Sequence, residues 1–71
     1  MRGWLKEKRN EKRYTMAQMA SMLGITESYY SMIEAGDRQK KMDLALAAKF
    51  SVVFGTPVEK IIELENQEGG E

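Results

Sequence analysis

The chain contains neither cysteine nor histidine among its 71 residues. Without cysteine, neither a disulfide framework nor a thiolate metal site is available. Histidine is the commonest general base and metal ligand, so its absence removes the residue on which much acid–base and metal chemistry depends. We therefore expect no enzyme, no catalytic residue, no metal and no cofactor.

Long hydrophobic runs are missing as well. The first five residues are followed by the charged run at 6–9, and no stretch approaches the roughly 20 apolar residues that a membrane-spanning helix needs. We predict a soluble, cytoplasmic protein with no membrane partner. A chain of 71 residues has room for one domain with a small core, so we expect no large pocket and no small-molecule ligand.

Net charge is also lacking, because 11 Lys and Arg balance 11 Asp and Glu. The charges are unevenly distributed: residues 1–41 hold nine basic against five acidic side chains, and residues 42–71 hold two against six. If folding gathers the basic half on one side, that side attracts phosphate. A mixed, solvated surface is the alternative, and composition alone leaves both open.

What the sequence does contain is helical pattern, with no strand pattern and no internal repeat. Apolar spacing and cap signals predict five helices, at Gly3–Lys12, about Met16–Leu23, Glu27–Ala35, Leu44–Phe54 and Pro57 to about Leu64. The last residues, 65–71, are acidic and contain glycine, so we predict a disordered tail there. The predicted domain is therefore 1–64.

Two of the predicted helices are joined by a tight turn. Thr15 is placed to cap the first, with Gln18 completing a capping box, and Gly24 supplies a positive φ for the turn. Thr26 then caps the next helix, which Gly36 ends. The pattern predicts a helix-turn-helix, in which a short turn fixes the angle between the helices and leaves the outer face of the second free to enter a DNA groove.

The helix at 27–35 has two faces on a helical wheel. Tyr30 and Ile33 share the inner face, and the outward residues are candidate readers of base edges: Glu27, Ser28, Ser31 and Met32. After Gly36 a polar loop offers candidate phosphate contacts: Arg38, Lys40 and Lys41. A solvated helix face and a solvated linker are the plainer readings of the two segments.

Apolar and capping positions predict further details of the fold. Trp4 and Leu5 are expected to anchor the first helix, and Arg13 falls where a left-handed residue should close it. The inner stripe of the second helix comprises Met19, Ala20 and Leu23. The fifth helix carries more apolar surface than it needs for anchoring, and we assign to a dimer interface Val58, Ile61, Ile62 and Leu64.

Residues 5–64 together resemble the phage-repressor-like, Cro/Xre-type helix-turn-helix family. The residues that carry the resemblance are Arg9, the segment TMAQMASMLGIT at 15–26, the run YYSMIEAG at 29–36, and FGTPV at 54–58 leading into Ile61. The resemblance implies an all-α, compact five-helix lambda-repressor-like DNA-binding domain, with helices two and three forming the helix-turn-helix.

The family pattern also implies roles for single residues. It implies an ion pair between Arg9 and Glu34 that ties the first helix to the recognition helix. Many relatives carry glutamine where this chain has Met16, so here the backbone amides of that helix start are left to bind phosphate. The predicted DNA-binding residues are Thr15, Met16, Gln18, Thr26, Glu27, Ser28, Tyr29, Ser31, Met32, Arg38, Lys40 and Lys41.

Two functions from different classes follow. The first is a sequence-specific transcriptional regulator, a repressor that binds a palindromic operator in double-stranded DNA as a homodimer, with helix three in the major groove. The alternative is a protein-interaction module on the same fold, such as an antitoxin-like or adaptor subunit. Glu27, the absence of arginine from the outer face of 27–35, and the apolar fifth helix favour that alternative.

Overall fold

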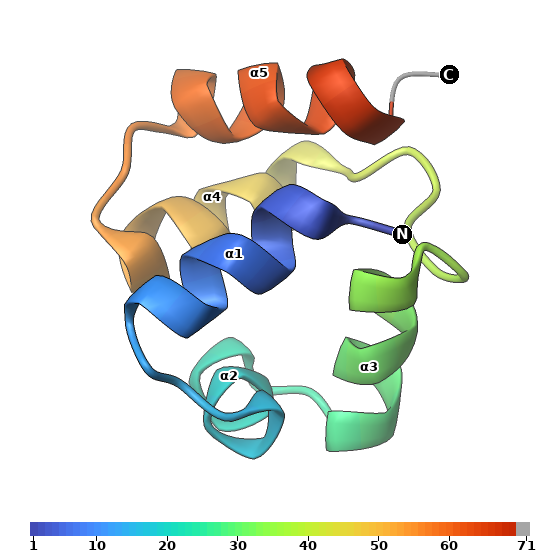
Figure 1. The fold of residues 1–71 in the computed structure, drawn as a ribbon, viewed down its shortest axis with the longest axis vertical. Coiled ribbons are helices and arrows are strands. Elements are labelled where there is room, and N and C mark those ends of the chain that lie inside the picture. Colours follow the sequence, from blue (N-terminus) through green and yellow to red (C-terminus); the bar gives the residue numbers. More distant parts are fainter. Residues whose placement is uncertain (70–71) are drawn as a thin grey trace.

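The computed structural model describes residues 1–69, and side chains through residue 67. Within these residues the fold is all-α, as predicted (Figure 1). The helices are α1 (Gly3–Glu11), α2 (Met16–Leu23), α3 (Glu27–Ala35), α4 (Leu44–Phe54) and α5 (Val58–Gly69). In Figure 1, α1 crosses the middle of the molecule in front of α4, α5 covers the top, and α2 and α3 lie below.

The bounds of α2, α3 and α4 agree with the sequence prediction because each helix has a clear capping residue at both ends. Their N-cap side chains accept a hydrogen bond from the amide three residues on, at 2.8–3.1 Å, and these caps are Thr15, Thr26 and Asp43. Their C-caps are left-handed glycines, Gly24, Gly36 and Gly55, with φ of 74°, 89° and 64°. The capping box between Thr15 and Gln18 is confirmed, with both of its hydrogen bonds present.

The first helix ends at Glu11, one residue before the predicted end. Arg13 has the left-handed backbone predicted for it, with φ of 60°. The amides of Arg13 and Tyr14 close the helix by donating to the carbonyls of Asn10 and Arg9, at 3.0 and 3.1 Å. A side chain in this conformation costs about 1 kcal/mol relative to glycine.

The predicted end of the fifth helix is wrong. It was expected to run from Pro57 to about Leu64 and to be followed by a disordered tail at 65–71, whereas α5 begins at Val58 and continues to Gly69. Glu65, in the segment predicted to be disordered, is half-buried and paired with Arg2 at 2.9 Å. An acidic composition predicts disorder only where the charges stay solvated, and this one meets a buried partner. Residues 70 and 71 lie outside the described residues.

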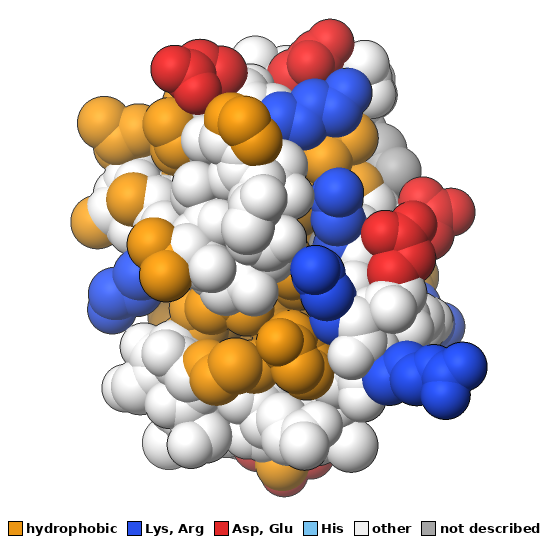
Figure 2. All heavy atoms as spheres, turned by 90° about the vertical axis from the view of Figure 1, so that its left-hand side faces the viewer, with side chains coloured by type: hydrophobic (Ala, Val, Ile, Leu, Met, Phe, Trp, Pro, Cys, Tyr) orange, Lys and Arg blue, Asp and Glu red, His pale blue; other side chains and the backbone are white. Residues whose placement is uncertain are grey.

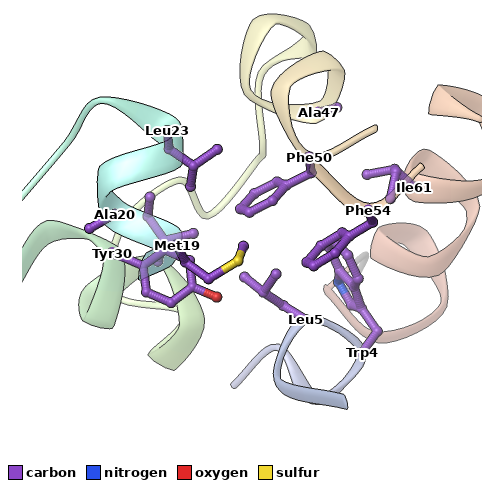
Figure 3. Packing of buried hydrophobic residues seen from close by; sticks show 11 residues of the cluster. Trp4, Leu5, Met19, Ala20, Leu23, Tyr30, Ala47, Phe50, Phe54 and Ile61 are labelled. Atoms are coloured by element: carbon purple, nitrogen blue, oxygen red, sulfur yellow. The ribbon is translucent and has the colours of Figure 1, made fainter. Parts of the chain in front are cut away.

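All five helices contribute to one hydrophobic core (Figure 3). As predicted, Trp4 and Leu5 anchor α1, with 3% and 0% of their surface exposed. Phe50 lies at the centre: its ring meets Trp4 edge to face at a centroid distance of 6.0 Å and stacks on Phe54 at 5.8 Å. The predicted inner residues of α2 are buried too, namely Met19, Ala20 and Leu23. This packing joins α4 and α1 to the helix pair that forms the candidate site.

The core also corrects the predicted dimer interface. Ile61 was assigned to that interface, but it is fully buried among the core residues and is unavailable to a partner. Val58 and Leu64 are half-buried and pack against the same core. Of the four predicted residues, Ile62 is the most exposed, at 39%. The prediction failed for Ile61 because apolar content alone does not tell which side of a helix faces its own core.

Candidate nucleic-acid interface

The turn between α2 and α3 is stabilised by backbone hydrogen bonds and by one apolar side chain that packs against the core. The amide of Ile25 donates to the carbonyl of Ala20 at 3.0 Å, and that of Gly24 to Ser21 at 3.2 Å. Ile25 is half-buried and packs against the core. Because Ala20 is small and only 3% exposed, α3 can approach α2 closely. The angle between the two helices is therefore set by packing.

The two faces of α3 separate as the helical wheel predicts. Tyr30 and Ile33 are fully buried. Glu27, Ser28 and Ser31 are exposed on the opposite side. These three side chains lie on the first two turns of α3 and form an uninterrupted polar surface there.

Met32, the fourth candidate reader, and its neighbour Tyr29 are less exposed than the other three. Met32 is half-buried, where the sequence placed it outward. Tyr29 is half-buried against the core, and its hydroxyl accepts a hydrogen bond from the Gln39 side-chain amide at 3.1 Å. Tyr29 therefore connects the recognition helix to the loop that follows it.

The predicted pair between Arg9 and Glu34 is present. Arg9 Nε and Nη2 donate to the two carboxylate oxygens of Glu34, at 2.9 and 3.2 Å, and the side chains are only 11% and 4% exposed. The hydrogen bond to Glu34 raises the pKa of the Arg9 guanidinium above its ordinary value, although burial opposes the shift. This bidentate pair ties α1 to the last turn of α3.

Tyr30 completes this buried polar group by donating its hydroxyl proton to Glu34 Oε2 at 2.8 Å. Burial and the hydrogen bond to Glu34 raise the pKa of Tyr30 far above the usual 10.0. The phenol therefore stays protonated and remains a donor. Glu34 thus accepts from two side chains, one on α1 and one on its own helix.

A second buried arginine, which the sequence did not reveal, lies at the end of α3. The guanidinium of Arg2 donates to the carbonyls of Ile33 at 2.6 Å and Arg38 at 3.1 Å, and also to that of Gln39. Its Nε and Nη2 each lie 2.9 Å from an oxygen of Glu65. Arg2 and Glu65 are 63 positions apart, so no local spacing could have predicted their pairing.

The loop after α3 exposes the cations that the sequence singled out: Arg38, Lys40 and Lys41. Between them, Gln39 is half-buried with a left-handed φ of 55°. The side chain of Gln39 bridges two elements, because its amide donates to the Tyr29 hydroxyl and its oxygen accepts from the amide of Asp43 at 3.3 Å. The loop therefore has a defined backbone while its cations reach into solvent.

The other residues predicted to contact DNA lie at the starts of α2 and α3. Thr15, Gln18 and Thr26 are exposed, and both threonines are engaged as caps. Met16 is half-buried and packs against the core, so its backbone amide rather than its side chain is the available group at the start of α2. First-turn amides of a helix point at an anion and favour negative charge.

The acidic residues of α5 lie at the end of the molecule opposite α2 and α3 (Figure 1). In Figure 2, which faces the left-hand side of Figure 1, acidic side chains stand at the top, and Lys and Arg side chains descend the right-hand part. Exposed cations of α1 and of the turn after it are Lys6, Lys12 and Arg13. Acidic side chains also lie among these cations on the right-hand part and at the bottom edge of this view, so charges of both signs are distributed along the molecule.

Comparison with known proteins agrees with this geometry. A family model described as Helix-turn-helix matches residues 5–61. The chain belongs to the Cro/Xre-type helix-turn-helix family. This helix-turn-helix chain is also similar to the uncharacterized HTH-type transcriptional regulator YqaF of Bacillus subtilis (strain 168), with 46% identity over 60 residues, 76% of this chain and 79% of the relative. No solved structure matches it.

The described part of this helix-turn-helix protein holds no candidate membrane span and no candidate metal cluster. None of its described helices has both the length and the apolar character needed to cross a membrane. Over the same part of the chain, no three Cys, His, Asp or Glu side chains are grouped in a way that could hold a metal ion.

Proposed function

We propose that this helix-turn-helix protein is a transcriptional repressor that binds a palindromic operator as a homodimer. The observation that supports this most directly is the recognition helix. Its inner face is locked by Tyr30, Ile33 and the Arg9–Glu34 pair, and its outer face exposes Glu27, Ser28 and Ser31. A rigid helix with a free polar face after a tight turn is suited to the major groove.

The residues of α3 predicted to bind DNA each have a role that their chemistry allows. Ser28 hydrogen-bonds to any base edge, and Glu27 accepts from the amino group of cytosine. Met32 packs on a thymine methyl group with the part of its side chain that is exposed. Tyr29 and Ser31 are within the same two turns and donate hydroxyl protons to the phosphates nearby.

Phosphate contacts come from both sides of α3. On one side the amides at the start of α2, behind Thr15, point at the backbone, with Gln18 beside them, and Thr26 at the start of α3 adds a further contact. On the other side the loop contributes Arg38, Lys40 and Lys41. These contacts fix the register of the protein on the duplex, and the residues of α3 supply the sequence preference.

The homodimer would place one α3 in each of two major grooves, about 34 Å apart. Ile62, together with the exposed edges of Val58 and Leu64, is the surface of α5 that we assign to the contact between the two copies. Repression would then be steric, because a bound dimer covers a promoter without needing an effector.

Selection of bound sequences from a random duplex library tests this function. The wild type should enrich a palindrome with half-sites about one helical turn apart. Ser28→Ala should relax the preference at one position of each half-site, whereas Arg38→Ala should weaken binding to all sequences and lower the salt slope by about 1. Failure to enrich any motif at low salt would remove the proposal.

A protein-interaction module on this fold is the second candidate. Two observations favour it: the outer face of α3 carries no Lys or Arg, and α4 exposes Leu44 and Val52 at 67% and 83% of their surface. The same selection separates the candidates, because an interaction module should give no enriched sequence and no difference between Ser28→Ala and the wild type.

A further inference from the structure

Arg2 is a charged side chain that the domain buries almost completely, with 3% of its surface exposed. Its donors are directed at three backbone carbonyls and at one carboxylate. Burying a guanidinium is costly unless its donors are satisfied, so this arrangement requires all of these partners at once. The reading of DNA by α3 does not itself use Arg2.

The carbonyls that Arg2 holds belong to the end of the recognition helix and to the loop after it. The carbonyl of Ile33 lies in the last turn of α3, where a cation also interacts favourably with the helix dipole. The backbone amide of Arg2 donates to the carbonyl of Glu34 at 2.8 Å. Arg2 therefore caps the C-terminus of α3 with both its main chain and its side chain.

Arg2 also donates to the carbonyls of Arg38 and Gln39, so its guanidinium lies against the backbone of the loop that carries the proposed phosphate contacts. Gln39 has a left-handed backbone, which a side chain other than glycine adopts at a cost. Hydrogen bonds from a buried cation to this residue and its neighbour hold the loop in that conformation. The exposed side chains of Arg38 and Lys40 are thereby held on either side of it.

Glu65 fixes the orientation of the Arg2 guanidinium. Its two oxygens accept from Arg2 Nε and Nη2, both at 2.9 Å, and Oε1 also accepts from Trp4 Nε1 at 3.0 Å. The Glu65 side chain is 12% exposed, so the pair is largely shielded from water. Without Glu65, Arg2 would keep a buried charge with no counter-ion and would move toward solvent.

We propose that Arg2 and Glu65 are a positioning pair that fixes the conformation of the loop at 37–41 and thereby couples the C-terminal part of α5 to DNA affinity. The coupling to DNA rests on the proposed function, whereas the fixing of the loop does not. Loss of a purely structural pair would instead lower the stability of the whole domain, so protection from proteolysis would fall equally in the loop and in the rest of the domain.

Limited trypsin digestion without DNA tests the loop directly, because trypsin cleaves after Arg38, Lys40 and Lys41. Glu65→Gln should raise the cleavage rate in the loop about tenfold, while cleavage after Lys49 in α4, which requires opening of the core, changes little. Equal acceleration at the loop and at Lys49 would show a purely structural pair and overturn the proposal.

Glu63→Gln is the matched control. Glu63 lies on the same helix, and its pair with Lys60 is a surface contact at 3.6 Å with the Lys60 and Glu63 side chains 50% and 57% exposed. The substitution changes the net charge by the same amount as Glu65→Gln. Loop cleavage should stay at the wild-type rate in Glu63→Gln, and indistinguishable rates in the two variants would overturn the proposal.

A second variant guards against loss of folding. Arg2→Met combined with Glu65→Leu removes both charges, and such replacements of buried pairs often keep or raise stability. Because neither charge is left unpaired, this double variant should melt near the wild-type temperature. Because it has no donor for the loop carbonyls, it should still be cleaved faster at 38–41. A folded double variant with wild-type loop cleavage would contradict the proposal.

DNA binding then tests the coupling. Both single variants gain one unit of positive charge, which by itself strengthens attraction to phosphate. We expect Glu65→Gln nevertheless to bind the selected operator about tenfold more weakly than Glu63→Gln, with a salt slope shallower by about 1. Equal affinities would overturn the coupling. If the wild type binds no duplex, the proposed function and the coupling fail together, and the trypsin result decides the loop by itself.

Discussion

Glu34 shows how much of this domain depends on single buried charges. Its carboxylate accepts from Arg9 on α1 and from Tyr30 on its own helix, and only 3% of the residue is exposed. A buried carboxylate without a counter-ion costs several kcal/mol, so the end of α3 is stable only while α1 supplies Arg9. The pair therefore specifies how the recognition helix sits as well as contributing to stability.

Removing Arg9 should be strongly destabilising for this reason. Arg9→Ala leaves Glu34 buried and unpaired, and we expect the free energy of unfolding to fall by about 3 kcal/mol in urea titration. Lys60→Ala is the control, because it breaks only the exposed pair with Glu63 and should cost less than about 0.5 kcal/mol. Similar losses in the two variants would contradict a buried role for the Arg9–Glu34 pair.

Tyr30 predicts a loss of stability in alkali. In the unfolded chain the phenol loses its proton near its ordinary pKa of 10.0, whereas burial and then Glu34 keep it protonated in the folded domain. Above pH 10 the unfolded state binds fewer protons, so stability falls with rising pH, by up to about 1.4 kcal/mol per pH unit from this group.

Urea titrations of the wild type and Tyr30→Phe between pH 9 and pH 11 measure this contribution. The variant should start lower by about 1 kcal/mol, because Glu34 loses one hydrogen-bond donor. Its stability should then decline less steeply than that of the wild type. Parallel declines over this pH interval would show that Tyr30 does not ionise on unfolding.

At the scale of elements, α2, α3 and α4 are bounded by local capping residues, and the junction of α1 and α2 differs from the other helix ends. Three helices end in left-handed glycines, but the turn after α1 uses Arg13 in the same conformation. Arg13 is exposed, and its amide hydrogen bond to Asn10 does not depend on its side chain. This junction is therefore a site of backbone strain.

Arg13→Gly should accordingly raise the free energy of unfolding by about 1 kcal/mol, less the greater entropy of glycine in the unfolded chain. Gln39→Gly is the informative comparison, because Gln39 is also left-handed at φ 55° but bonds to Tyr29 and Asp43 through its side chain. Thermal melts should show stabilisation in the first variant and none in the second. Destabilisation by Arg13→Gly would instead show that the Arg13 side chain makes a stabilising contact.

At the scale of the whole molecule, the chain is closed on itself by long-range contacts. Arg2 near one end binds Glu65 near the other, and Arg2 also donates to the carbonyls of Arg38 and Gln39 in the loop that follows α3. The acidic α5 covers the end opposite the helix-turn-helix (Figure 1). The proposed DNA face and the proposed dimer face therefore belong to one packed unit.

Substitutions at two neighbouring isoleucines of α5 distinguish an effect on folding from an effect on dimer assembly. Ile61→Ala opens a cavity in the core and should cost about 2–5 kcal/mol, whereas Ile62→Asp should melt close to the wild type. If Ile62 lies in the contact between copies, the aspartate should weaken the dimer at least about tenfold in sedimentation equilibrium. A wild type that remains monomeric at high concentration would rule out this interface.

The features that the sequence predicted correctly have local causes. Threonine and aspartate caps and left-handed glycines define α2, α3 and α4, since each acts within three or four residues. The Arg9–Glu34 pair is not local, and it was predicted because the family resemblance implied it. The structure contains it at 2.9 Å.

Only the tertiary structure decided how α5 is used. The sequence alone determined five helices, the caps of α2, α3 and α4 and the two faces of α3, because helical period and capping are short-range properties. It did not distinguish Ile61 in the core from Ile62 at the surface, and it assigned Glu65 to a disordered tail. Those outcomes depend on where Arg2 and Trp4 lie in space, and residues more than 60 positions apart meet through the packing of the whole chain.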